Sequence, residues 1–341
     1  MSVTRPDSTM TQGETMAYRP VPSDAPTADD SPSRRRVLRG TTAVGVGALT
    51  AWAGAGGTHA AAVSQRRTGT ARIISCHTGP FEVLALLDAH GTFPGKRQNW
   101  FPDASDADWA RAEQLDPAAF GPDDTWELDF RCYAVRRPGG RVTLVDTGIG
   151  AVGSPASGWA PVPGHLPTVL GHAGIERDDV DTVVLTHLHE DHYGWTVDAT
   201  GTPLFPNARH VVQRSEIASL AADDSSLAYV VEPLRRAGLL HQIDGRVSVQ
   251  GGPGHSSLTA VPTPGHTAGH QSVLVDGGQG RIMITGDVLV HAVQLAAPSV
   301  AYRLESDQVT ARRTRQTLLA DARDRGHLLA TAHLNHPFLR P

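Results

Sequence analysis

Apolar residues are grouped along this chain in short runs that are separated by polar or glycine-rich segments. Such runs are typical of strands that are buried on at least one face. They predict strands over 71–75, 127–136, 141–145, 182–185, 209–213, 258–261, 271–275 and 281–285. Pro138-Gly139-Gly140 supplies a turn, so the second and third of these strands are expected to form a hairpin. The run 82–86 suits a strand or a short helix.

Helical patterns alternate with these runs. One short helix is expected around 107–115, inside an insertion at 92–125 that is rich in proline, aspartate and aromatic residues. Helical material is also expected from 215 to about 236, and a charged, exposed helix over 307–325. Strands that alternate with helices predict one α/β domain with a sizeable core over residues 63–341.

The first 62 residues differ from this pattern and are excluded from the predicted fold. A polar, proline-rich leader precedes Ser33-Arg34-Arg35-Arg36-Val37-Leu38-Arg39, which resembles a twin-arginine export signal. The stretch 40–57 is too short and too weakly apolar to span a membrane. Small residues at 58–62 suit signal cleavage. We therefore expect an exported protein, secreted or extracytoplasmic, without stable membrane insertion.

The net charge of the chain limits the classes of molecule that we expect it to bind. The whole chain has 30 Lys and Arg against 35 Asp and Glu. Residues 1–62 contain six of the former and five of the latter, which leaves 24 against 30 in the remainder and a net charge of about −6. Proteins that bind nucleic acids normally present a basic surface, so we expect no nucleic-acid partner.

The densest group of candidate functional residues follows the apolar run Val183-Val184-Leu185. The segment Thr186-His187-Leu188-His189-Glu190-Asp191-His192 places the candidate ligands His187, His189, Asp191 and His192 within six residues. Because side chains alternate along a strand, two of the imidazoles would project to the same side, and the following turn would bring the other two groups nearby. Imidazole and carboxylate are good ligands for zinc and similar ions, so the spacing predicts two metal ions side by side.

Further motifs follow in order. Gly265-His266 lies in a turn, Gly286-Asp287 ends a strand-like run, and Ala332-His333 follows another apolar run. Val145-Asp146-Thr147-Gly148 precedes them all. In this order the motifs resemble those of the metallo-β-lactamase-fold hydrolase superfamily, over roughly residues 73–337. The resemblance implies a four-layered αββα sandwich.

The resemblance also implies how the candidate ligands divide between two divalent metal ions, for which zinc is the default. The first metal would be held by His187, His189 and His266, the second by Asp191, His192 and His333, with Asp287 bridging the two. His270 is expected to orient a ligand or a carbonyl from behind, and Asp146 to support the site in a similar way. The set contains no cysteine and leaves open positions, as in catalytic rather than closed structural sites.

The chemistry expected of such a site is activation of water. Two cations would lower the pKa of a shared, bridging water, so that a hydroxide nucleophile exists near neutral pH. We expect Asp191 and Asp287 to be the catalytic carboxylates, the former passing a proton toward the leaving group and the latter bridging the metals. No serine or cysteine nucleophile is needed.

Two segments, 290–300 and Phe205-Pro206-Asn207-Ala208, resemble the exported methyl parathion hydrolase-like branch, which is related to the quorum-quenching lactonases. This implies a small-molecule lactone or carboxylic ester as substrate, with phosphotriester cleavage as a side activity. Two alternatives stay open: an organophosphate hydrolase, and a catalytically idle metal-binding secreted protein. Relatives of this kind suggest a homodimer.

Other positions lead to weaker expectations. Tyr193 and Trp195 should lie near the metals, and aromatic residues at 93, 100 and 101 could form an apolar lid or be ordinary core residues. Cys76 and Cys132 could form a disulfide if segments 71–77 and 126–137 pair, or remain two buried thiols. The chain ends eight residues after His333, which would loosen the second metal site or open the pocket.

Overall fold

The computed structural model describes residues 72–341, so the predicted export signal at 1–62 lies outside the described residues. Thirteen strands in this part form two sheets. The first sheet runs in chain order: β1 (Ile73–Thr78), β2 (Phe81–Lys96), β3 (Thr125–Arg136), β4 (Val142–Val145), β5 (Val180–Val184), β6 (Arg209–Gln213) and β7 (Leu240–Ile243). The second has the order β13 (Phe338–Leu339), β12 (Leu328–Ala330), β11 (Arg281–Ile284), β10 (Gln271–Asp276), β9 (Ser257–Pro262) and β8 (Val247–Gly251).

Both sheets are mixed. In the first sheet β1 to β4 are antiparallel, and β4 to β7 are parallel to one another. In the second sheet β11 and β12 are parallel and the other pairs are antiparallel. The parallel strands end at the same edge, and the loops that follow them supply most of the candidate site.

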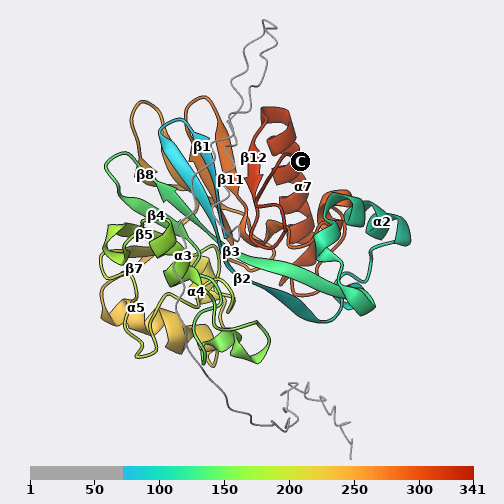
Figure 1. Cartoon of the computed structure of the whole chain (residues 1–341), viewed down its shortest axis with the longest axis horizontal. Coiled ribbons are helices and arrows are strands. Elements are labelled where there is room, and N and C mark those ends of the chain that lie inside the picture. The colour runs from blue at the N-terminus through green and yellow to red at the C-terminus, as the bar shows by residue number, and fades with distance from the viewer. Residues whose placement is uncertain (1–71) are drawn as a thin grey trace, which may run out of the picture. The chain divides into compact units, whose positions relative to one another are not determined.

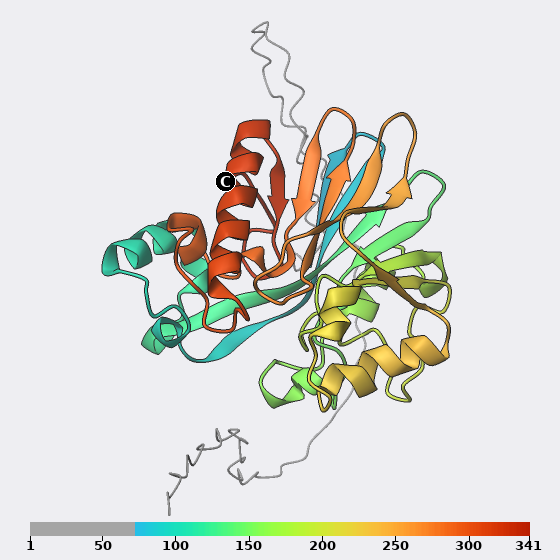
Figure 2. The same cartoon turned by 180° about the vertical axis from the view of Figure 1, so that it is seen from behind.

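Helices cover the outer face of each sheet (Figures 1 and 2). The helices are α1 (Arg97–Trp100), α2 (Asp106–Leu115), α3 (Leu166–His172), α4 (Arg214–Ala218), α5 (Glu232–Arg236), α6 (Val293–Ala296) and α7 (Gln308–Arg325). Helices α3 to α5 lie against the first sheet, whereas α7 lies against the second. This arrangement confirms the four-layered αββα fold. In the part of the chain that the structure describes, no helix is long and apolar enough to span a membrane.

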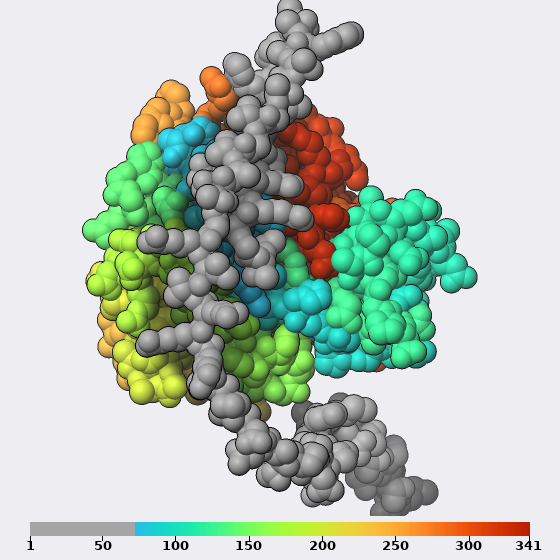
Figure 3. Space-filling view, in the orientation of Figure 1, coloured from blue at the N-terminus to red at the C-terminus, as the bar shows by residue number. Residues whose placement is uncertain are grey.

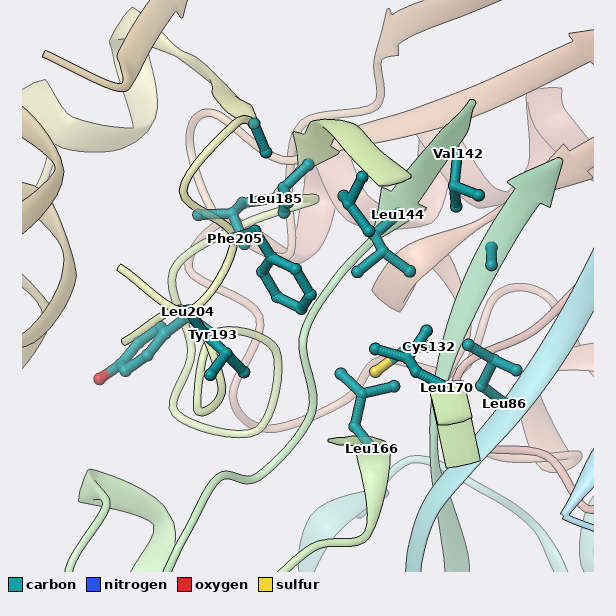
Figure 4. Close-up of a cluster of buried hydrophobic side chains, with 14 of the residues drawn as sticks. Leu86, Cys132, Val142, Leu144, Leu166, Leu170, Leu185, Tyr193, Leu204 and Phe205 are labelled. Atoms are coloured by element: carbon teal, nitrogen blue, oxygen red, sulfur yellow. The ribbon is translucent and has the colours of Figure 1, made fainter. Parts of the chain in front are cut away.

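Strand alternation divides the core into layers. On β3, Cys132 and Ala134 face the cluster beneath α3 and α5, whereas Tyr133 and Val135 face the second sheet. Figure 4 shows the first of these clusters, with Phe205 packed beside residues of β4 and α3. Burial of each such apolar side chain contributes roughly 1.5–3 kcal/mol. A further core lies between the second sheet and α7.

The two longest strands, β2 and β3, form a hairpin with α1 and α2 in the segment that joins them (Figure 1). In the space-filling view this segment is the teal surface at the right (Figure 3). This part of the chain has its own apolar cluster, which includes Phe93, Phe101 and Trp126. It corresponds to the predicted insertion. The prediction that the insertion begins at 92 is wrong, because β2 continues to Lys96 and pairs there with Thr125.

Three other expectations can be compared with the fold. The run 82–86 is a strand, the first part of β2. The helical material expected over 215–236 is interrupted between α4 and a π-helical turn at Leu227–Val231, because Asp224 accepts hydrogen bonds from the backbone N–H and hydroxyl of Ser226. β7, β8 and β13 were not predicted as strands.

The two cysteines are both free and buried. Strand β2 lies between their strands, with Val83 opposite Cys76 and Leu86 opposite Cys132. The two thiols also face different core layers. Of the two alternatives, the structure therefore shows two separate buried thiols.

Candidate metal centre

Seven side chains converge beyond the ends of four strands. Four come from the loop after β5, one from the loop between β9 and β10, one from the turn after β11 and one from the loop after β12. They are His187, His189, Asp191, His192, His266, Asp287 and His333. The structure thus brings together every ligand expected from the sequence.

Three of these histidines form a first cluster. The Nδ1 atom of His189 lies 3.0 Å from Nε2 of His187 and 2.9 Å from Nε2 of His266. Ligand atoms bound to a common zinc ion at about 2.0–2.1 Å stand roughly 3.3 Å apart in a tetrahedron. The three nitrogens therefore have the spacing of a shared metal.

Asp191, His192 and His333 form a second cluster. Oδ2 of Asp191 lies 3.5 Å from Nε2 of His192 and 3.5 Å from Nε2 of His333. These distances again match ligands around one ion, now with one carboxylate and two imidazoles. No cysteine takes part in either cluster, which suits an open site more than a closed structural one.

Asp287 lies between the two clusters. Its Oδ2 is 3.3 Å from His266 Nε2, and its Oδ1 is 3.4 Å from His192 Nε2 and 3.2 Å from His333 Nε2. Oδ1 of Asp287 and Nε2 of His192 are buried without a hydrogen-bond partner. Because an unsatisfied buried polar atom is costly, these orphaned atoms fit metal binding.

Hydrogen bonds on the far side of each ring fix which nitrogen faces the cluster. Nδ1 of His192 donates to Asp146 at 2.9 Å, and Nδ1 of His333 donates to the carbonyl of Asp129 at 2.9 Å. Nδ1 of His187 lies 3.0 Å from the hydroxyl of Thr186, which itself donates to Asp146. These contacts turn the three Nε2 atoms toward the clusters, where they can serve as ligands.

Asp146 supports the site from β4, as the Val-Asp-Thr-Gly motif predicts. Its backbone φ is 61°, a left-handed conformation that is uncommon for a residue with a side chain. The carboxylate accepts hydrogen bonds from the backbone N–H of Thr186 at 2.7 Å, from the Thr186 hydroxyl and from His192. The strained backbone is thus stabilised by contacts that aim the side chain at the first motif.

His270 has the supporting position expected for it. Its Nδ1 donates toward Thr263, and its Nε2 accepts the backbone N–H of Asp287 at 2.9 Å. Gly286 must be glycine here, because its φ is 53° and a Cβ atom would lie 2.7 Å from Nε2 of His270. The imidazole therefore holds the turn that presents the bridging carboxylate.

Two buried carboxylates tie the loops together, and sequence reasoning missed both. Glu216 accepts hydrogen bonds from the backbone N–H groups of Leu188 and Gly269 at 2.9 Å each, which joins the first motif to the His266 loop. Asp88, at a bulge of β2, accepts backbone N–H groups from residues 149, 165 and 166. Most of their partners are backbone N–H groups, which leave no motif in a sequence.

The two clusters differ in the direction in which their surroundings shift the pKa values of their histidines. Burial and the neighbouring imidazoles lower the pKa of His187 and of His266 well below the usual value. Burial opposes charge on His192 too, but the carboxylates of Asp287 and Asp191 outweigh it and raise the pKa of His192. Burial likewise disfavours a charged Asp287, yet His333 and His192 hold its pKa well below the usual range. The bridging residue is thus a carboxylate, the form that binds cations.

A cavity of about 500 Å³ opens onto these clusters. It is lined by Phe93, Pro94, Trp100, Trp126, Leu128, Trp159, Leu188, His189, Glu190, Asp191, Tyr193, Asp224, Ser225, His266, Asp287, Val290, Tyr302, Leu304 and His333. Two of the three expected lid residues, Phe93 and Trp100, are present, and so is Tyr193. Phe101 is buried behind the lining, so of the two alternatives it is a core residue. Trp195 does not line the cavity, and its indole donates to Asp88.

The end of the chain is anchored beside the site. Strand β13 pairs with β12, and Arg131 donates to the carbonyls of Thr331 and Leu334. The hydroxyl of Tyr133 lies 2.8 Å from the Thr331 carbonyl. The expectation that the short end leaves His333 loosely held is therefore wrong.

Two face-to-face sheets between helices, with a histidine and aspartate cluster beyond their strand ends, define a metallo-β-lactamase type of α/β sandwich. A family model described as the metallo-beta-lactamase superfamily matches residues 131–333. The chain therefore belongs to this superfamily.

Individual relatives are similar over part of the chain. An N-acyl homoserine lactonase, AttM, from Rhizobium radiobacter is 32% identical over 169 residues, which cover 44% of this chain and 60% of that protein. An N-acyl homoserine lactonase from Bacillus sp is 28% identical over 180 residues, 49% of this chain and 66% of that protein. This chain thus matches about three-fifths of the length of the first of them.

Solved structures show the same fold. The crystal structure of the hydrolase AbOPH has a TM-score of 0.66 at 24% identity, covering 79% of this chain and 92% of that one. AidC, a dizinc quorum-quenching lactonase in complex with a product, has a TM-score of 0.61 at 21% identity, with coverages of 78% and 91%.

Proposed function

We propose that this protein is a dinuclear metal-dependent hydrolase that opens lactones or cleaves carboxylic esters. The observation that carries the proposal is the position of Asp287, whose two oxygens each approach a different cluster of candidate ligands. Two divalent cations held there would lower the pKa of a shared water and would polarise the carbonyl oxygen of an ester. The similarity to proteins named as lactonases supports the choice of bond.

Each residue of the cluster has a role in this proposal. One ion would be held by His187, His189 and His266, the other by Asp191, His192 and His333, and Asp287 would contribute an oxygen to each. Zinc suits a set of imidazoles and carboxylates without thiolates. Asp191 also lines the cavity, so its carboxyl group can move a proton to the departing alcohol.

The shape and lining of the cavity support a partly apolar substrate. Most of the lining side chains away from the ligands are aromatic or aliphatic, among them Phe93, Trp126 and Leu304. Such a surface binds an acyl chain by removing it from water, while the carbonyl group points to the cluster. We propose a lactone or ester whose acyl part is a neutral hydrocarbon chain or amide.

The experiment is proton release from the full chain loaded with zinc, measured in a pH-stat with N-hexanoyl homoserine lactone and with an aryl phosphotriester. We expect faster opening of the lactone, and loss of activity in His187→Ala. Faster phosphotriester cleavage would reassign the protein to the organophosphate hydrolases. A protein that binds two zinc ions and turns over neither these compounds nor simple aryl esters would contradict the proposal and favour the idle metal-binding alternative.

We also propose that the protein is exported, because residues 33–39 resemble a twin-arginine signal. Expression in a bacterium with the twin-arginine pathway should place the protein outside the cytoplasm. Replacement of Arg34, Arg35 and Arg36 by lysine should retain it inside. Export that is unaffected by these changes would contradict this part of the proposal.

A further inference from the structure

Two acidic side chains line the cavity beyond the candidate ligands. Glu190 belongs to the loop after β5, and Asp224 belongs to the segment between α4 and α5. The neighbouring lining residues Tyr193 and Ser225 are uncharged, with their hydroxyl oxygens 3.4 Å apart. The remaining lining residues outside the metal clusters are apolar or aromatic.

Neither acidic group is neutralised by its neighbours. Glu190 accepts a hydrogen bond from the indole N–H of Trp159 at 2.8 Å, and Asp224 accepts from the N–H and hydroxyl of Ser226 at 2.9 and 2.6 Å. These donors are uncharged. Within residues 72–341, the lining of this cavity includes no lysine or arginine, and neither carboxylate forms an ion pair. Both side chains therefore direct negative charge into the space that a substrate must enter.

We propose that Glu190 and Asp224 select substrates by charge, so that the enzyme prefers esters and lactones with a neutral or cationic acyl part over those with a second anionic group. This inference rests on the proposed hydrolase function and specifies its substrate class. A carboxylate on the acyl chain would meet two like charges in a partly apolar cavity, where screening by water is weakened. A quaternary ammonium group would instead be attracted to the carboxylates and to the aromatic rings beside them.

The experiment compares three 4-nitrophenyl esters of equal chain length, which end in a carboxylate, a primary amide or a trimethylammonium group. The zinc-loaded full chain is assayed at about pH 8, where carboxyl groups are ionised. We expect kcat/KM for the carboxylate ester to be about tenfold lower than for the amide, a difference of ~1.4 kcal/mol. Raising the salt concentration from about 0.02 M to about 0.5 M should reduce this ratio, because salt screens the charges.

Two variants test whether Glu190 and Asp224 cause the difference in kcat/KM between the amide and carboxylate esters. In the double variant Glu190→Gln/Asp224→Asn, the ratio between amide and carboxylate esters should fall to about threefold or less. The control is Asp223→Asn, which removes one negative charge from an exposed neighbour outside the cavity lining and should keep the ratio near tenfold.

Two results would overturn the inference while leaving the proposed function intact: equal kcat/KM for the amide and carboxylate esters, or a ratio that the double variant does not change. Hydrolysis of none of the three esters by zinc-loaded protein would overturn the proposed ester hydrolysis and this inference with it.

Discussion

Asp146 sets the geometry of the candidate site without being one of its proposed ligands. Its left-handed backbone aims one carboxylate at Thr186 and His192, so that two residues of the first motif are held together. A carboxylate that accepts the Nδ1 proton also increases the basicity of the opposite nitrogen. The orientation of His192 therefore depends on a residue from another strand.

Asp146→Asn should lower metal affinity by about 10- to 100-fold, because an amide offers one accepting oxygen where the structure uses two. Competition with a chelator measures this on the full chain. Asp276→Asn is the control, since Asp276 pairs with Arg281 at the far end of β10. Unchanged affinity in the Asp146 variant would show that the hydrogen bonds to His192 do not tune the ligand.

A second residue-scale prediction concerns His210 on β6. Burial lowers the pKa of His210 to about 4, and its Nδ1 donates to the carbonyl of Ala208. The ordinary pKa is about 6.5, so the neutral ring stabilises the fold fully above that pH, and the contribution is lost as the pH falls toward 4.

Between pH 7 and pH 5, His210 should therefore reduce the free energy of unfolding by ~2 kcal/mol. Urea unfolding at both pH values measures the loss, and in His210→Leu the loss should be ~2 kcal/mol smaller than in the unmodified chain, whatever the stability of the variant at pH 7. A variant with the same pH dependence as the unmodified chain would refute the assignment to His210.

The candidate ligands could be predicted from the sequence because their side chains occur in short motifs. The supporting residues could be predicted only where they belong to such a motif, as Asp146 does. Asp88 and Glu216 could not, since most of their partners are backbone N–H groups that the fold brings close. The choice of Nδ1 on His189 also depends on loop geometry.

At the scale of elements, strand β3 holds in place the loop after β12 that carries His333. Arg131 reaches two carbonyls of the loop around His333, and it also forms an ion pair with Asp129, whose own carbonyl accepts the His333 ring N–H. One strand of the first sheet thus positions a loop of the second. This contact with β3 supports the second metal cluster through His333.

Arg131→Met should consequently weaken one metal site more than the other. We expect zinc to leave the full-length variant in two separated steps during chelator titration, with the weaker site reduced by about tenfold or more. The matched control is Arg136→Met on the same strand, where the guanidinium pairs with Glu82 and the carbonyl of Ala173. Equal weakening of both sites would indicate a general loss of stability.

The strands that were predicted have long apolar runs or a strong turn signal, such as the hairpin of β3 and β4. Strands β7, β8 and β13 have partly exposed residues and short runs, so their pairing depends on neighbours distant in sequence. The break after α4 was missed because it depends on a local side-chain turn at Asp224.

On the scale of the whole domain, both sheets contribute to both clusters. The first cluster combines His187 and His189 from the first sheet with His266 from the second, and Asp191 and His192 join His333 in the same way. Bound metals would therefore cross-link the two halves of the sandwich.

Metal removal should lower the melting temperature for this reason. A ligand at about 100 times its Kd adds ~2.7 kcal/mol per site, which corresponds to roughly 5–10 °C for a domain of this size. Thermal unfolding of the full chain with zinc and after chelation measures the shift, and Asp287→Asn should lose most of it. A melting temperature that does not respond to zinc would contradict metal binding across the sheets.

The hairpin of β2 and β3 separates a part of the cavity lining from the candidate metal ligands. All seven candidate ligands lie outside 97–124, yet Trp100 from that segment lines the cavity, and both ends of the segment are fixed by paired strands. Changes between these strands that keep Asp116, whose carboxylate accepts the backbone N–H of Asn335 near His333, would alter which acyl groups fit while leaving the reactive groups in their places. Selection or engineering can therefore change the substrate range through residues 97–124 without changing the candidate metal ligands.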